Sequence, residues 1–253
     1  MKLNDKVAVI TGAAGGIGAA LARRFCAEGA TVVLSDLAGD ELTATAAELN
    51  CLAVPCNVTR EAELKALIAQ AEDKHGNIDV FCSNAGICHS GGEEVSNDEW
   101  QLNWDIHVMA HVYAARALAP KMAERNEGYL INTSSAAGLL SHVNSATYAV
   151  TKHAAVAFAE WISITYGNRG VKVSVLCPQA VRTAMTQGVE EGVASIDGMM
   201  EPEVLADCVV ATIEKEEFLI LPHREVLDYM RRKTSDYDRW LSGMRKLRDK
   251  YQR

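Results

Sequence analysis

Tyr148 and Lys152 stand four residues apart at the start of an Ala-rich run with helical spacing. Side chains at positions i and i+4 share one face of a helix. A free phenol, with a pKa of about 10, is a poor base at neutral pH, but a nearby ammonium group favours the phenolate and lowers that pKa. The pair could therefore move a proton, although a lone Tyr-x-x-x-Lys more often marks a solvated helix face. Ser135 follows a predicted strand, where its hydroxyl could bind a substrate carbonyl or alkoxide.

A glycine-rich turn follows the first predicted strand and precedes a helix; it reads Thr11-Gly12-Ala13-Ala14-Gly15-Gly16-Ile17-Gly18. Glycines let the backbone turn sharply and approach a phosphate. The helix behind the turn offers free N–H groups and the positive end of its dipole to a pyrophosphate. An ordinary turn would have the same composition, but the position between a strand and a helix favours a dinucleotide site.

Asp36 comes after the second predicted strand, 18 residues beyond Gly18. A carboxylate at this point can accept hydrogen bonds from ribose hydroxyls and would repel a 2′-phosphate. No Lys or Arg stands beside Asp36 or in the glycine turn to neutralise such a phosphate. The sequence therefore favours NAD over NADP, the alternative being that Asp36 is a solvated loop residue.

These residues need strands and helices to position them, and the first 180 residues repeat one pattern of a short apolar run, a turn and a helical run. Most of the apolar runs do not alternate with polar residues, which is typical of parallel strands covered on both faces. The pattern predicts an α/β fold: a doubly wound, Rossmann-like parallel sheet of about seven strands with helices on both faces. The predicted strands are Val7–Thr11, Thr31–Ser35, Leu52–Val54, Asp79–Ser83, Tyr129–Thr133, Val171–Leu176 and Phe218–Leu221, and the clearest helical runs are Ile17–Glu28, Glu61–His75, Trp104–Glu124 and Ala146–Tyr166.

Composition excludes several classes of protein. Of the 253 residues, 49% are apolar and 23% are charged, which is too apolar for a disordered chain. There is no apolar run long enough to span a bilayer, and the charged first residues do not resemble a secretory signal. The seven cysteines are irregularly spaced and include no Cys-x-x-Cys pair, so we expect reduced thiols, no metal site and a cytoplasmic protein.

Charge is unevenly distributed along the chain. Residues 222–253 hold ten Lys/Arg and five Asp/Glu, a net charge of +5, so residues 1–221 hold fifteen basic and twenty-eight acidic residues, a net charge of −13. An acidic body of this kind argues against nucleic acid as a partner. Tyr237, Trp240, Leu241, Met244, Leu247 and Tyr251 follow helical spacing and predict an amphipathic helix in the basic tail.

Taken together, the motifs resemble those of the short-chain dehydrogenase/reductase family, in its branch of single-domain chains of about this length. The resemblance spans most of the chain and keeps the family's order. Its pieces are Thr11–Gly18, Asn84-Ala85-Gly86, Asn132-Thr133-Ser134-Ser135, Tyr148-Ala149-Val150-Thr151-Lys152 and Pro178 through Thr183.

The resemblance implies a role for each matching residue. Ser135 would hydrogen-bond the substrate oxygen, Tyr148 would be the acid/base, and Lys152 would lower the tyrosine pKa and hold the nicotinamide ribose. The remaining cofactor contacts would come from Gly12, Gly16, Ile17, Gly18, Asp36, Asn57, Val58, Asn84, Ala85, Gly86, Pro178, Val181 and Thr183.

Three residues depart from the family's usual pattern. His107 stands where many members have an asparagine that supports the proton relay from the lysine. His107 could replace that asparagine as a catalytic residue or could simply be packed. Gln179 replaces the usual glycine and could contact substrate. Asn57 stands where aspartate is common, and its amide oxygen could still accept from an adenine amino group.

By analogy with the family, the pocket would be walled by three segments, Ile87–Gly92, Leu139–Asn144 and Ala184–Met200, the last a Gly-rich loop suited to a mobile lid. We expect Ser135, His142, Gln179 and Met185 to bind substrate, although His89 and His142 are more readily explained as exposed loop residues. No arginine cluster is evident in these segments, which favours a neutral substrate.

The sequence thus predicts an oxidoreductase that transfers a hydride between NAD(H) and a neutral secondary alcohol or ketone. The alternatives are a redox epimerase or lyase of the same superfamily, and a non-catalytic NAD-sensing protein. We expect a catalytic domain over residues 1–221 and a helical extension over 222–253, packed on its own subunit or on a neighbouring one. Family members usually form dimers or tetramers, so a homo-oligomer is expected.

Overall fold

The computed structural model describes residues 1–188 and 192–251. Its seven strands form one sheet in the order β3-β2-β1-β4-β5-β6-β7, and every neighbouring pair is parallel. The strands are β1 (Val7–Thr11), β2 (Thr31–Ser35), β3 (Leu52–Ala53), β4 (Val80–Ser83), β5 (Gly128–Thr133), β6 (Val171–Leu176) and β7 (Leu219–Ile220). The predicted Rossmann-like fold class is therefore confirmed.

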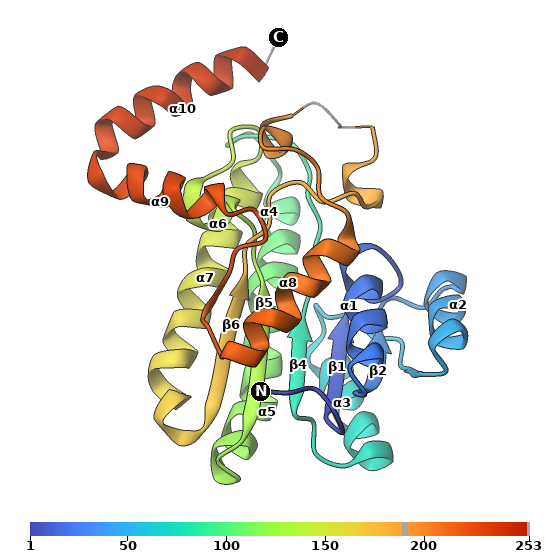
Figure 1. The fold of residues 1–253 in the computed structure, drawn as a ribbon. Coiled ribbons are helices and arrows are strands. Elements are labelled where there is room, and N and C mark those ends of the chain that lie inside the picture. The colour runs from blue at the N-terminus through green and yellow to red at the C-terminus, as the bar shows by residue number, and fades with distance from the viewer. Residues whose placement is uncertain (189–191, 252–253) are drawn as a thin grey trace.

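Helices cover both faces of this sheet (Figure 1). One face is covered by α1 (Gly16–Ala27), α2 (Asp40–Leu49) and α8 (Pro202–Lys215), and the other by α3 (Glu61–His75), α5 (Ala110–Glu124) and α7 (Ala146–Tyr166). The strands between them are buried on both sides: every residue of β1, β4 and β5 is buried. This double burial is the physical reason why β1 and β4 are apolar almost throughout instead of alternating.

The strand ends lie in register, which brings the loops after them to one edge of the sheet. Thr11 at the end of β1 lies beside Ser35 of β2, and Ser83 at the end of β4 lies beside Asn132 of β5. The strand order reverses between β1 and β4, the usual position of a ligand crevice in such sheets.

The helical run predicted over Trp104–Glu124 is interrupted in the structure. Helix α4 (Asn97–Trp104) ends where that run was expected to begin, a π-helical turn follows at Asp105–Met109, and α5 starts at Ala110. The spacing of apolar residues does not reveal a change from α-helix to π-helix, because the chain remains helical. Short 3-10 turns occupy Gly167–Arg169, Ala184–Thr186 and Val193–Ser195, and α6 covers Ala137–Leu140.

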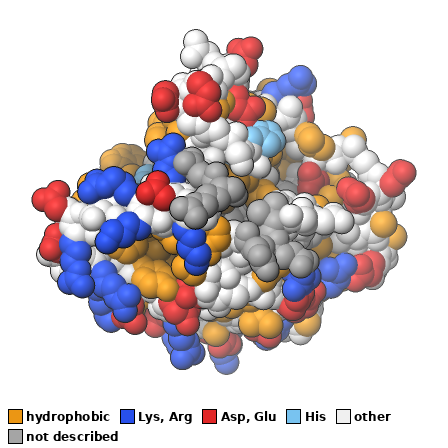
Figure 2. All heavy atoms as spheres, turned by 90° about the horizontal axis from the view of Figure 1, so that it is seen from above, with side chains coloured by type: hydrophobic (Ala, Val, Ile, Leu, Met, Phe, Trp, Pro, Cys, Tyr) orange, Lys and Arg blue, Asp and Glu red, His pale blue; other side chains and the backbone are white. Residues whose placement is uncertain are grey.

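The C-terminal extension forms two helices, α9 (Glu225–Ser235) and α10 (Tyr237–Tyr251). Val226 of α9 is fully buried in a small cluster with Ala136 and Leu140 from the region of α6. Helix α10 contains no buried residue and runs over the end of the molecule at which the strands finish (Figure 1). Seen from above, Lys and Arg side chains surround a group of hydrophobic side chains on the side of the extension (Figure 2).

None of the described helices is both long and apolar enough to cross a membrane.

Candidate active site

A cavity of about 1180 Å³ opens at the carboxyl ends of the strands. It is lined by the glycine turn after β1, the segments after β4, β5 and β6, the first turns of α7, and parts of α9 and α10. Its lining includes all of the site residues predicted from the sequence except His107. His107 lies behind the wall, completely buried.

The glycine turn lies close against neighbouring backbone. Gly12 and Gly16 have φ values of +67° and +53°, a region that L side chains rarely adopt. A Cβ on Gly18 would lie 2.0 Å from the carbonyl oxygen of Gly12, whereas a Cβ on Gly15 would meet nothing within 4 Å. Gly15 is the N-cap of α1 and supplies no side-chain cap, so backbone N–H groups remain to bind an anion at this wall. This arrangement fits a dinucleotide pyrophosphate.

Asp36 lies half-buried beside the glycine turn and ties the turn to β2. Its Oδ2 accepts a hydrogen bond from the backbone N of Ala14 at 3.0 Å, and its Oδ1 accepts one from the backbone N of Leu37 at 2.7 Å. The nearby lining residues Leu37 and Glu41 bring no positive charge. Asp36 thus presents its carboxylate on this wall with no positive charge from Leu37 or Glu41, which suits ribose hydroxyls and disfavours a 2′-phosphate.

Asn84 connects the ends of three strands. Its Nδ2 donates to the carbonyl oxygen of Thr11 at 3.1 Å, and its Oδ1 accepts from Thr133 Oγ1 at 3.2 Å. The amide thereby fixes the distance between the glycine turn after β1 and the segment after β5 that holds Ser135.

Ser135, Tyr148 and Lys152 meet in the cavity. Ser135 Oγ lies 3.3 Å from the Pro178 carbonyl oxygen, to which it donates. Lys152 Nζ lies 5.4 Å from the centre of the Tyr148 ring and donates to the Thr133 carbonyl oxygen at 3.0 Å. The spacing of four residues on α7 therefore does bring the phenol and the ammonium group to the same site.

Burial dominates the proton affinities at this site. Burial raises the pKa of Tyr148, and a hydrogen bond with Ser135 opposes that increase. Burial also lowers the pKa of Lys152 to about 8. From the sequence, the ammonium group of Lys152 is expected to lower the pKa of Tyr148. In the structure that pKa is raised, because removal of the phenol from water outweighs the hydrogen bond with Ser135.

His107 sits in the π-helical turn with both ring nitrogens occupied. Its Nε2 accepts from the backbone N of Ile87 at 3.2 Å, and its Nδ1 lies 2.9 Å from Thr151 Oγ1. Thr151 Oγ1 itself donates to the Thr147 carbonyl at 2.7 Å, so Nδ1 carries the proton in this arrangement. Burial, followed by the nearby charge of Lys152, keeps the pKa of His107 well below its ordinary value.

The two histidines expected near the pocket, His89 and His142, lie in different places in the structure. The His142 ring packs edge-on against Tyr148 with ring centres 5.8 Å apart, so His142 lies in the cavity instead of in an exposed loop. His89 is exposed and pairs with Glu99 outside the cavity lining.

Two amides are already engaged within the protein. Gln179 lines the cavity, but its Nε2 donates to Asp197 Oδ2 at 2.9 Å. Asn57 Oδ1 accepts from the backbone N and the hydroxyl of Thr59, so the acceptor expected to face adenine is occupied.

The loop after β6 completes the wall. Val181 is buried, Thr183 lies next to Gly16, and Met185 is 49% exposed on the cavity lining. Positions 189–191 of the expected Ala184–Met200 wall, Val189 among them, lie outside the described residues. Among the described residues, no group of three His, Cys, Asp or Glu side chains is placed to hold a metal ion.

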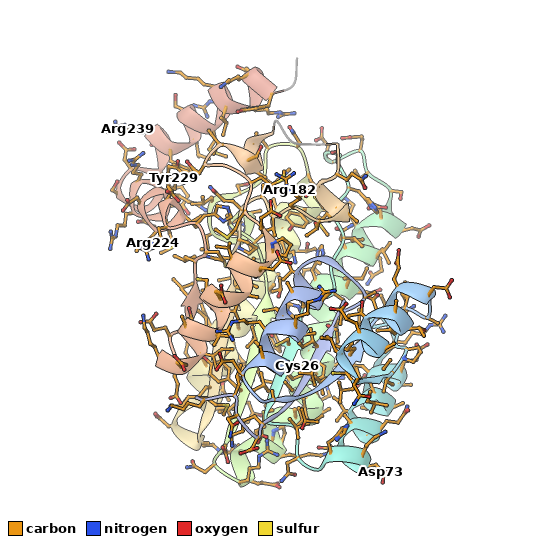
Figure 3. All side chains as sticks on the ribbon, turned by 45° about the vertical axis from the view of Figure 1, so that its right-hand side comes forward. Cys26, Asp73, Arg182, Arg224, Tyr229 and Arg239 are labelled. Atoms are coloured by element: carbon orange, nitrogen blue, oxygen red, sulfur yellow. The ribbon has the colours of Figure 1, made fainter. Side chains whose placement is uncertain are left out.

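The extension, expected to pack on its own subunit or on a neighbouring one, lines the cavity of its own chain. Tyr229 and Arg232 of α9 and Trp240, Met244 and Leu247 of α10 all line it, as does the exposed Arg239. Tyr229, Arg239 and Arg182 lie at the same end of the molecule, away from Asp73 (Figure 3). The apolar spacing of residues 237–251 was the signal for this wall, but spacing alone does not show which surface a helix covers.

Comparison with known proteins assigns the family. The family model described as short chain dehydrogenase matches residues 6–194. The 1-deoxy-11-beta-hydroxypentalenate dehydrogenase of Streptomyces exfoliatus is 40% identical over 198 residues, which cover 75% of this chain and 72% of the relative. The chain belongs to the short-chain dehydrogenase/reductase family. This short-chain dehydrogenase is also 34% identical to the meso-2,3-butanediol dehydrogenase of Serratia marcescens over 192 residues, which cover 74% of this chain and 76% of that one.

A solved structure resembles this short-chain dehydrogenase over most of its length. The crystal structure of a short-chain dehydrogenase/reductase from Burkholderia phymatum, in complex with NAD, superposes with a TM-score of 0.86 at 28% identity. The match covers 94% of this chain and 96% of that chain. The family model ends at residue 194, before α8, α9 and α10.

Replacing Lys152 by methionine should stabilise this short-chain dehydrogenase at pH 7. The unfolded chain holds the lysine proton up to about pH 10.5 and the folded chain only up to about pH 8, so the folded state pays for a buried charge below pH 8. Removal of the charge should raise the free energy of unfolding by on the order of 1–2 kcal/mol, after loss of the bond to Thr133 is subtracted.

Urea unfolding at pH 7 and pH 9.5 measures this effect. Wild-type stability should contain a contribution that increases between these pH values and that the Lys152→Met variant lacks. A variant less stable than wild type at pH 7 would contradict the assignment of Lys152 as a costly buried charge.

Proposed function

We propose that the protein oxidises a secondary alcohol to a ketone with NAD, or catalyses the reverse reduction, with Tyr148 as the acid/base. The observation that carries this proposal is the meeting of Ser135, Tyr148 and Lys152 in a cavity that also contains the glycine turn. The family supports an oxidoreductase, and the similar Streptomyces and Serratia proteins are named as dehydrogenases of hydroxy compounds.

The cofactor would lie along the wall that runs from the glycine turn to the loop after β6. Gly12, Gly16, Ile17 and Gly18 would hold the pyrophosphate side, and Asp36 the adenosine ribose. Val58, Ala85, Gly86, Pro178, Val181 and Thr183 line the continuing wall, together with Asn57 and Asn84. The bound nicotinamide would exchange a hydride with the substrate carbon. NAD is favoured over NADP by the unpaired charge of Asp36, and the Burkholderia relative was solved with NAD.

Proton transfer falls to Tyr148. In the oxidation, the phenolate oxygen takes the hydroxyl proton of the alcohol as the C–H bond gives up its hydride; in the reduction, the phenol returns that proton to the carbonyl oxygen. Ser135 Oγ would hydrogen-bond the same substrate oxygen and stabilise its developing charge. Because burial raises the phenol pKa, neutral pH favours the protonated form that reduction requires, and higher pH favours oxidation.

We propose that the part of the substrate that lies near Ser135 and Tyr148 is neutral. Lys152 is the single buried Lys or Arg in the described part of the chain, and Arg232 and Arg239 are exposed side chains of the extension. The expectation of a neutral substrate rests on the lack of an arginine cluster in the pocket segments; these two arginines limit that expectation to the end of the cavity near Ser135 and Tyr148.

Turnover by the full chain tests this function. Secondary alcohols with NAD+ and NADP+ in separate assays should give reduced cofactor by absorbance, with NAD+ preferred by at least about tenfold. Tyr148→Phe should still bind NAD+ by calorimetry but lose at least about 100-fold in hydride transfer, because it lacks the acid/base. A Tyr148→Phe variant that keeps activity would overturn the mechanism.

The same experiment distinguishes the proposed function from the two alternative functions. A non-catalytic NAD sensor predicts NAD binding with no turnover by wild type, and the intact Ser135, Tyr148 and Lys152 argue against it. A redox epimerase or lyase would convert substrate without net accumulation of reduced cofactor.

We further propose that His107 is a positioning residue. Its two ring nitrogens hold the backbone at Ile87 and the hydroxyl of Thr151, and thereby join the wall after β4 to α7. With the ring neutral and both nitrogens engaged, His107 does not titrate in the working pH range.

Asparagine and alanine substitutions test this role. His107→Asn keeps a donor and an acceptor and should retain kcat/KM within about fivefold, whereas His107→Ala should lower it by at least about tenfold through misplacement of Tyr148. Neither variant should shift the inflection of the pH–rate profile. A shifted inflection would show that His107 takes part in proton transfer.

The exposed apolar side chains of α7 support a homo-oligomer. Trp161 is 56% exposed and Ile164 81% exposed on this helix, and α7 also carries the small residues that allow close helix contact. Light scattering should give at least a dimer for wild type and a monomer for the double variant Trp161→Glu, Ile164→Glu. A monomeric wild type would contradict the proposal.

We also propose residues 1–221 as the NAD-binding and catalytic domain and 222–253 as its extension. The free thiols of the described cysteines support a cytoplasmic location.

A further inference from the structure

We propose that α9 and α10 form the outer wall of the substrate site and select a bulky, apolar secondary alcohol over a short diol. This inference rests on the proposed function and names its substrate class.

Helix α9 is fixed to the catalytic body by burial and by a charged side chain. Val226 is fully buried beside Leu140, whose segment lines the cavity. Lys233 Nζ donates to the Leu139 carbonyl oxygen at 2.7 Å. Loss of both contacts would be needed to release α9, so the extension is part of the folded body and not a free tail.

Asp197 joins the extension to the loop after β6. Tyr229 of α9 donates its hydroxyl to Asp197 Oδ1 at 2.8 Å, and Gln179 Nε2 donates to Asp197 Oδ2 at 2.9 Å. Gln179 directly follows Pro178, whose carbonyl accepts from Ser135. A continuous set of bonds thus connects α9 to the residue proposed to hold the substrate oxygen.

Helix α10 presents an apolar face to the cavity. Trp240, Met244 and Leu247 recur at helical spacing, and all three line the cavity while remaining partly exposed. Leu241, on the same helix, is 46% exposed and is not part of the lining. The cavity-facing side chains therefore have apolar surface that an apolar ligand would cover.

The segment after β4 borders the same cavity as α10. Backbone hydrogen bonds from Gly92 and Glu94, and then the nearby charge of Arg248, lower the pKa of Glu94. Glu94 follows the segment after β4 whose residues Ile87 and Cys88 line the cavity. Arg248 of α10 is thus near enough to Glu94 to affect its pKa, and Leu247 lines the cavity together with Ile87 and Cys88.

The space and its chemistry set the substrate class. A cavity of about 1180 Å³ exceeds the roughly 300–1,000 Å³ of a site for one drug-sized ligand, which leaves room for a substantial substrate beside a dinucleotide. Leu140, Met185 and Ile196 continue the apolar wall of α10 around this space. A fused-ring alcohol would cover these surfaces, whereas a four-carbon diol would leave most of them wet.

Matched substitutions on α10 provide the test. The full chain, saturated with NAD+, is assayed with 2-decalol, cyclohexanol and 2,3-butanediol, and kcat/KM is compared for wild type, Met244→Ala and Leu241→Ala. Wild type should prefer 2-decalol. Met244→Ala should reduce the preference for 2-decalol over cyclohexanol by at least about fivefold, because it removes apolar contact with the larger ring system. Leu241→Ala should leave that preference within about twofold of wild type.

Two results would overturn the inference: a wild type that prefers 2,3-butanediol, or equal effects of Met244→Ala and Leu241→Ala. If wild type turns over no alcohol, the proposed function fails, and a binding measurement then tests whether α10 forms the wall. Calorimetric binding of 2-decalone should then be weakened by Met244→Ala and not by Leu241→Ala, and equal affinities for all three proteins would reject the wall. Circular dichroism and thermal unfolding of each variant establish that α10 remains folded.

Discussion

Burial of the Lys152 ammonium group beside the Tyr148 phenol is the constraint on which the site depends. The ammonium group is held by one carbonyl oxygen, that of Thr133 at the end of β5. Burial makes the charged lysine and the charged phenolate costly when each is alone, as the directions of both pKa values show. The protonation states of Tyr148 and Lys152 will therefore respond to a bound ligand that brings charge. The buried charge at the same time lowers the stability of the folded protein.

The architecture serves this constraint by bringing strand ends to one edge. Asn84 fixes the ends of β1, β4 and β5 relative to one another, so the glycine turn and Ser135 keep a set distance. His107 and Thr151 then join the segment after β4 to α7, on which Tyr148 and Lys152 lie. The proposed substrate wall lies elsewhere, on the loop after β6 and the extension, which Asp197 links through its two carboxylate oxygens.

The fold was predictable because the amino-acid composition of its strands reflects their burial. The bounds expected for β1, β2 and β6 agree with the structure. Strands β1 and β2 are nearly uninterrupted apolar runs, as buried parallel strands usually are, whereas β6 carries Lys172 and Ser174 between its valines. The edge strands β3 and β7 are shorter than expected, because pairing is limited to two residues in each. The break before Ala110 was not predictable, because a π-helical turn leaves the helical pattern of the sequence unchanged.

The residues of the site were predictable from the sequence, but the direction in which the pKa of Tyr148 shifts was not. Motif order placed Ser135, Tyr148 and Lys152 together, and the cavity does contain all three. Burial, which reverses the expected direction of the tyrosine pKa, depends on tertiary packing that spacing does not encode. The position of Trp240 on the cavity wall depends on the turn between α9 and α10, which no motif marks.

The pH dependence of a single turnover tests the central role of the Tyr148 phenol most directly. Stopped-flow formation of reduced cofactor from excess enzyme, NAD+ and a secondary alcohol measures hydride transfer without product release. The rate should increase with pH as the phenol loses its proton and should then level off. Hydride transfer that proceeds at one rate across the whole stable pH range would show that no such proton is involved, and would contradict the account.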